Sequence, residues 1–141
     1  MQNNPYTQRI DEQIHSAGPV ELVAMLNRSL CQRIGQAREA QRAGDMRGRA
    51  AAVSRAIAIV GELAQSLRPE AEPELAGTLR ELYAFVVDRL LQGNAQQLDA
   101  PLAEAQRVAE VLAEAWRELG DAAMPATVIT EAIPAGLSCC G

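Results

Sequence analysis

The sequence has few residues that could carry chemistry. It contains one histidine, three cysteines and no lysine in 141 residues. A zinc site needs about four Cys or His ligands, and His15, Cys139 and Cys140 are too few. No Glu-x-x-His, Cys-x-x-Cys-His or lysine-bearing phosphate loop occurs, which argues against di-iron, haem and nucleotide sites. Cys31 lies in a helical pattern and is interpreted as a small apolar residue. We therefore expect no metal, no cofactor and no enzymatic activity.

The chain also lacks a basic block and a long apolar run. All 13 basic residues are arginine, against 18 acidic residues, for a net charge of −5. This balance disfavours nucleic-acid binding. No run of about 18 apolar residues is present, so we expect no membrane insertion. The first residues, Met1 to Pro5, do not have the layout of a signal peptide, and we expect a cytoplasmic protein.

What the chain does contain is alanine and leucine, both good helix formers. Apolar residues make up 48% and aromatic residues 3% of a chain the size of one domain. Helix-start and helix-stop residues divide it into four helices. We expect helices from Pro19 to Ala43, from Met46 to Leu67, from Pro73 to Gly93, and from Asp99 to Leu119. Gly44, Gly93 and Gly120 are the expected stops, and Asp45 and Asp99 the expected caps.

Each predicted helix carries an apolar stripe at spacings of three and four residues. The clearest begins at Leu98 and Leu102 and continues to Trp116 and Leu119. Such stripes and short connections favour antiparallel neighbours crossing at about 20°. We therefore predict an all-α fold, an up-down-up-down four-helix bundle. The bundle would span residues 19–119, with an N-terminal arm or short helix at 1–18 and a tail at 120–141.

Three of the helices have more apolar residues than a bundle core requires. Val87 and Leu91 point away from the stripe of the third helix, and Val108 and Val111 flank that of the fourth. An apolar stripe of about 100° suffices for one packed face, so wider stripes indicate a second buried surface. A thick core could absorb them; the alternative is an exposed groove for a partner helix, an extended segment or a second copy of the chain.

Several short motifs in order resemble the flagellar export chaperones of the FliS type. The resemblance covers residues 4–119 and is carried by Asn4-Pro5-Tyr6, Ala17-Gly18-Pro19, Leu22-Val23-Ala24-Met25-Leu26, Gly44-Asp45, Glu62-Leu63 with Ser66-Leu67, Leu82-Tyr83 with Arg89-Leu90-Leu91, and Trp116. Family members usually continue Met-Leu-Tyr-Asp-Gly where this chain has Met25-Leu26-Asn27-Arg28-Ser29. Arg9 stands where a second N-terminal tyrosine is usual.

The resemblance implies a chaperone that binds the disordered C-terminal segment of flagellin, or a related late export substrate, and delivers it to the flagellar export machinery. Motif positions give Tyr6, Ile10, Leu26, Asn27 and Leu30 as partner-binding residues, beside the surplus residues Val87, Leu91, Val108 and Val111. Tyr6 and Ile10, four residues apart, would anchor the arm in the groove when cargo is absent. The alternative function is a helical adaptor or dimerisation module without secretion cargo.

Overall fold

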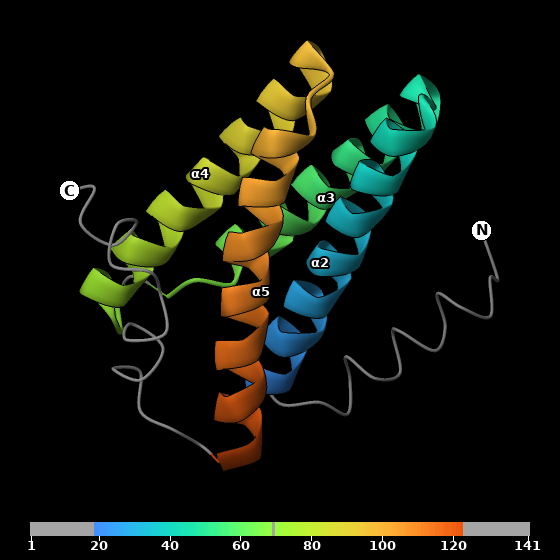
Figure 1. Ribbon diagram of the computed structural model, residues 1–141. Helices are drawn as coiled ribbons and strands as arrows, with labels where there is room; N and C mark the ends of the chain where they lie inside the picture. Colours follow the sequence, from blue (N-terminus) through green and yellow to red (C-terminus); the bar gives the residue numbers. More distant parts are fainter. Residues whose placement is uncertain (1–18, 69, 123–141) are drawn as a thin grey trace, which may run out of the picture.

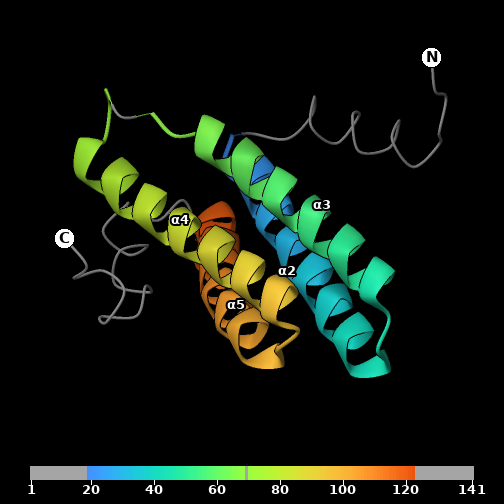
Figure 2. The same ribbon diagram turned by 90° about the horizontal axis from the view of Figure 1, so that it is seen from above.

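The computed structural model describes residues 19–68 and 70–122 and shows an antiparallel four-helix bundle (Figure 1). The helices are α2 (Pro19–Ala43), α3 (Met46–Gln65), α4 (Pro73–Gln96) and α5 (Asp99–Ala122). Each packs on its neighbours in the chain, and α5 closes the ring against α2. The view from above shows α3 beside α2 and α4 beside α5 (Figure 2), and buried side chains from all four helices form one main core. The predicted all-α up-down-up-down bundle is confirmed.

The core is built almost wholly from aliphatic side chains. Its fully buried large residues come from all four helices: Leu30, Ile34, Leu63, Leu79, Leu82, Val86, Leu90, Leu102 and Leu112. Alanines such as Ala37, Ala56 and Ala105 lie between them and are also completely buried. Alternating large and small side chains let the helices approach closely, so this core needs few aromatic residues.

The turn between α2 and α3 follows the predicted signals. Gly44 adopts a left-handed φ of 72°, which ends α2 at Ala43. The Oδ1 atom of Asp45 accepts a hydrogen bond of 2.9 Å from the backbone N–H of Gly48. Asp45 is therefore the N-cap of α3, as its position in the sequence predicts.

The predicted ends of α4 and α5 are wrong in three respects. The helix α4 continues through Gly93 to Gln96, and Gln97 takes the left-handed conformation with φ 57°. Gly93 is buried because Leu102 packs where its side chain would be: a Cβ there would lie 2.6 Å from Leu102 Cδ2. The helix α5 likewise continues through Gly120 to Ala122, and Asp99 is its first residue. Leu98 precedes α5 and is 49% exposed, so it is not a core residue.

Polar contacts join the two turns at one end of the bundle. Arg49 is 5% exposed; its Nε donates to Asn94 Oδ1 at 2.8 Å and its Nη1 to Gln41 Oε1 at 2.7 Å. Nearby, Arg38 donates two hydrogen bonds of 2.8 Å to the carboxylate of Asp99. This pairing lowers the pKa of Asp99. The α2–α3 turn is thereby fastened to the α4–α5 turn.

Candidate functional site

An apolar hollow of about 480 Å³ lies between α3 and α4. We call it the α3–α4 groove, lined by Ile57, Val60, Gly61, Ala64, Arg80, Tyr83, Ala84, Val87, Asp88 and Leu91. Most of these side chains are aliphatic or small, and only Arg80 and Asp88 carry charge. A surface of this kind can bury the apolar side of a partner segment while its charges orient that segment.

The groove exists because α3 and α4 pack less closely than the other neighbouring helices. Gly61 and Ala64 on α3 and Ala84 on α4 line it with little side-chain volume. A Cβ added at Gly61 would meet no atom within 4 Å. Since small residues on both helices cannot fill the space between them, apolar neighbours there remain open to a partner.

Two of the sequence-predicted contact residues lie in this groove. Leu91 is 53% exposed, one of the three large hydrophobic residues among the described positions that are strongly exposed. Val87, one turn earlier on α4, is half-buried and packs on the core from the groove side. The apolar surplus on α4 thus faces a hollow and is not absorbed by the core. That these side chains contact a partner stays a prediction.

Three other predicted contact residues are core residues instead. Val108 is 4% exposed, and both Asn27 and Leu30 are 0% exposed. The expectation that Val108 lies on a free surface is wrong because α5 packs against both α2 and α4, so its apolar stripe must cover two neighbours. Asn27 donates from Nδ2 to the Val23 carbonyl at 2.9 Å. A partner could reach these three only by opening the bundle.

The remaining predicted contacts are dispersed. Leu26 is half-buried and packs against the core from α2. Val111 is half-buried on α5, and neither residue lines the α3–α4 groove. Tyr6 and Ile10 lie outside the described residues. The nine predicted positions therefore do not form one surface, and the groove itself depends on residues of α3 that the sequence did not single out.

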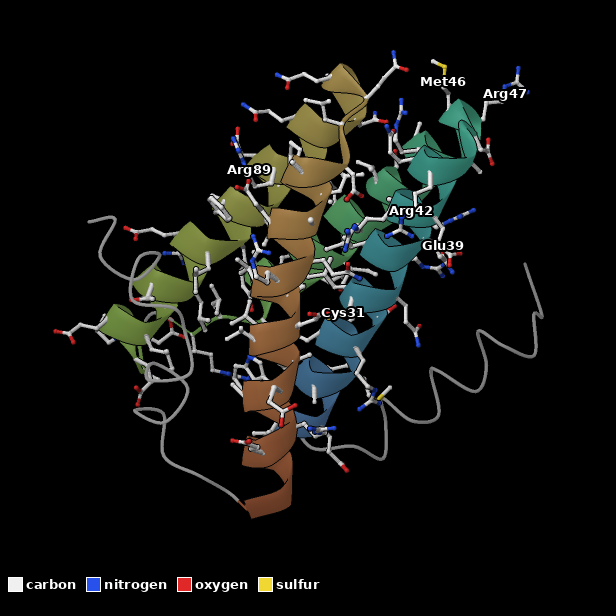
Figure 3. All side chains as sticks on the ribbon, viewed as in Figure 1. Cys31, Glu39, Arg42, Met46, Arg47 and Arg89 are labelled. Atoms are coloured by element: carbon white, nitrogen blue, oxygen red, sulfur yellow. The ribbon has the colours of Figure 1, made fainter. Side chains whose placement is uncertain are left out.

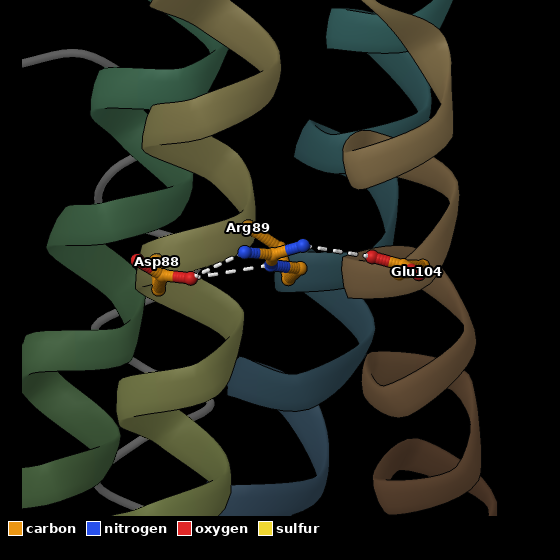
Figure 4. Close-up of polar contacts among 3 residues, drawn as sticks. All are labelled: Asp88, Arg89 and Glu104. Carbon is orange, nitrogen blue, oxygen red and sulfur yellow. Dashed lines mark hydrogen bonds and ion pairs between the residues drawn. The ribbon is translucent and has the colours of Figure 1, made fainter.

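A charged cluster beside the groove fastens α4 to α5. The Nη2 atom of Arg89 contacts Asp88 Oδ2 at 2.7 Å, and its Nη1 contacts Glu104 Oε1 at 3.2 Å (Figure 4). The guanidinium also lies 5.7 Å from the centroid of the Phe85 ring. Arg89 thus joins a carboxylate of the groove lining to α5.

A second hollow of about 230 Å³ lies at the end of the bundle away from the two turns. We call it the end hollow, lined by Val20, Val23, Ser66, Leu67, Arg68, Ala71, Glu72, Leu75, Ala76, Leu79, Tyr83 and Trp116. It forms where the start of α4 and the end of α5 diverge (Figure 1). Tyr83 Oη and Trp116 Nε1 are buried there without a hydrogen-bond partner among the described residues. No pattern in the sequence indicates this hollow.

The described side chains form no cluster of metal ligands. Within residues 19–68 and 70–122, no three His, Cys, Asp or Glu side chains gather where they could hold a metal ion. Cys31 lies midway along α2 (Figure 3). Burial and the nearby charge of Glu110 raise its pKa to about 11, which keeps the thiol protonated at neutral pH. No described helix is both long and apolar enough to cross a membrane.

The sequence is similar to those of known flagellar proteins. The family model described as flagellar protein FliS matches residues 1–123. The chain is 31% identical over 111 residues to the flagellar secretion chaperone FliS of Salmonella typhimurium, covering 78% of this chain and 82% of that protein. It is 29% identical over 107 residues to the flagellar secretion chaperone FliSB of Pseudomonas aeruginosa, covering 76% and 85%. The chain therefore belongs to the FliS family of flagellar proteins.

Proposed function

We propose that this protein is a cytoplasmic, non-catalytic chaperone that binds the disordered C-terminal segment of flagellin in the α3–α4 groove. Binding would cover the segment's apolar residues, prevent premature polymerisation and hold the subunit for delivery to the flagellar export machinery. The observation that carries the proposal is the groove itself, in which Leu91 is exposed and Val87 half-buried beside small residues of α3.

The groove suits a segment that folds as it binds. Apolar residues of an amphipathic helix recur at intervals of three and four positions. Val87 and Leu91 present apolar side chains one turn apart on α4, which matches that spacing. Fully burying one leucine side chain contributes about 1.5–3 kcal/mol, but ordering the segment costs about 2–5 kcal/mol or more. Affinity is thereby limited, as suits a cargo that must be released.

Charges at the groove fix the direction of the bound segment. Arg80 is exposed and lies near the N-terminal part of the groove along α4, whereas Asp88 lies two turns later. A segment with an acidic residue facing Arg80 and a basic residue facing Asp88 would be favoured over the reverse order. Exposed charge pairs contribute only about 0.2–1 kcal/mol each, so they select orientation more than they increase affinity.

The test compares Leu91→Asp with Met46→Asp, using titration calorimetry with a peptide of the flagellin C-terminal segment. The two residues are similarly exposed, at 53% and 56%, but Met46 lies at the α2–α3 turn (Figure 3). Both variants should remain folded because half of each side chain already meets water. Leu91→Asp should weaken binding by about tenfold or more, since the lost apolar burial and the buried charge together exceed about 1.4 kcal/mol.

Equal binding by Leu91→Asp and the unmodified protein would refute the groove as the cargo site. Met46→Asp should bind as the unmodified protein does; an equal loss in both variants would show a nonspecific effect of charge.

The alternative function, a dimerisation module, uses the same apolar surplus. Sedimentation of the protein with and without the flagellin peptide separates the two. We expect a monomer whose sedimentation changes on adding the peptide. A tight dimer that ignores the peptide would support the module instead.

A further inference from the structure

The end hollow has apolar walls, and two of its lining residues carry polar atoms that are fully enclosed. Its lining is mostly aliphatic, with Leu67, Leu75 and Leu79 among its residues. Tyr83 is 2% exposed, and its Oη has no hydrogen-bond partner among the described residues. The Nε1 atom of Trp116 is likewise buried and unpartnered. Neither atom has surface that an occupant could reach without a shift of its neighbours, so the apolar walls define the hollow, which favours an occupant that brings apolar side chains.

We propose that the chain's own C-terminal segment occupies this hollow, with Val128 and Ile129 inserted among its aliphatic residues. The proposal concerns an intramolecular contact that needs no cargo, so it does not rest on the function proposed above.

Chain length and position permit this contact. The last residue of α5, Ala122, is six residues beyond Trp116, or about 9 Å along the helix at 1.5 Å per residue. The five residues 123–127 span up to about 17 Å when extended, at about 3.3–3.6 Å per residue. Val128 and Ile129 can therefore return to the level of Trp116. Pro125 lies between and disfavours continuation of α5.

The composition of the segment matches the hollow. Residues 122–130 carry no charged side chain, and Val128 and Ile129 are adjacent. An apolar cavity of about 150 Å³ holds a benzene-sized molecule, so a hollow of about 230 Å³ suits two aliphatic side chains.

The N-terminal segment fits the hollow less well, although it precedes Val20 in the chain. Its apolar residues Tyr6, Ile10 and Ile14 are spaced by four, which gives a long stripe suited to a groove and not to a compact hollow. Arg9 and Asp11 flank Ile10 directly, and burying charges without partners is costly.

Trp116 is the only tryptophan of the chain, so its fluorescence reports on the hollow directly. The full-length protein is compared with the double variant Val128→Ser/Ile129→Ser and with the matched control Thr127→Ser/Thr130→Ser. The first variant should shift tryptophan emission to longer wavelength and increase its quenching by acrylamide, because water reaches the ring. The control should match the unmodified protein.

A chain ending at Ala122 should show the same change, and a synthetic peptide of residues 123–141 should reverse it. Far-UV circular dichroism checks that the helices remain in every variant. If the shortened chain unfolds, the proposal is tested by the double serine variant alone. Unchanged emission and quenching in the serine variant would overturn the proposal. It would also be overturned if deletion of residues 1–15 alone produced the change, or if dilution did so, since a second copy would then be the occupant.

Discussion

Two glycines of the same helix should respond to alanine in opposite directions. Gly93 and Gly77 both lie within α4. At Gly93 an added Cβ would lie 2.6 Å from Leu102 Cδ2 and 3.1 Å from the Leu98 carbonyl oxygen. At Gly77 an added Cβ would meet no atom within 4 Å. The backbone change is the same in both variants, so the difference between them isolates the steric contact.

The magnitudes follow from two opposing effects. Replacing a mid-helix glycine by alanine stabilises a helix by about 0.5–1 kcal/mol. Overpacking a core with an extra methyl group costs about 1–3 kcal/mol, and Leu102 is fully buried and has little room to move. Gly77→Ala should therefore raise the free energy of unfolding by about 0.5–1 kcal/mol, and Gly93→Ala should lower it by about 1–2 kcal/mol.

Urea unfolding followed by circular dichroism measures both changes as shifts of the midpoint at constant slope. If Gly93→Ala stabilised the protein as much as Gly77→Ala does, the close packing of α4 against Leu102 would be refuted. If Gly77→Ala destabilised the protein, the reasoning from open space at that position would fail.

Three further predictions concern the polar end, the groove and the N-terminal segment. The Arg38 ion pair lowers the pKa of Asp99, so its stabilisation is present above the ordinary aspartate pKa and is lost as pH falls through the lowered value. Asp99→Asn should reduce the free energy of unfolding by about 0.5–1 kcal/mol at neutral pH, and this difference should shrink as the pH falls through the lowered pKa of Asp99. Urea titrations at neutral and acidic pH measure the change, and a pH-independent difference would contradict it. Val87→Asp should leave a folded bundle by circular dichroism but weaken binding of the flagellin peptide, and unfolding would show that Val87 acts as a core residue. Deleting residues 1–15 should strengthen cargo binding or leave it unchanged in calorimetry, whereas a large loss would make that segment a cargo contact.

The fold could be predicted from the sequence because its signals are local. Periodic apolar residues, the Asp45 cap and the left-handed Gly44 depend on neighbours within one or two turns. The predicted helix end at Gly93 is wrong because this glycine makes room for Leu102 of α5. No local pattern in the sequence encodes that contact. The same holds for Arg49, whose partners Gln41 and Asn94 come from two other helices.

The site could be predicted only in part for a similar reason. An apolar surplus on a helix indicates a second surface, and for Leu91 that surface is open. For Val108 the second surface is another helix of the bundle, because α5 lies between α2 and α4. Periodicity gives the width of an apolar stripe but does not distinguish a neighbouring helix from a partner. Of the small residues that open the groove, Ala64 belongs to the apolar stripe of its helix and Gly61 to none, and neither is predicted to be a contact residue.

The most direct test of the groove as the cargo site is site-specific crosslinking. A photoreactive amino acid is placed at Leu91 in one sample and at Met46 in the other, and each protein is irradiated with the flagellin C-terminal peptide. We predict a covalent adduct with the peptide from position 91 and none from position 46. An adduct from position 46 alone, or equal yields from both, would contradict binding in the α3–α4 groove.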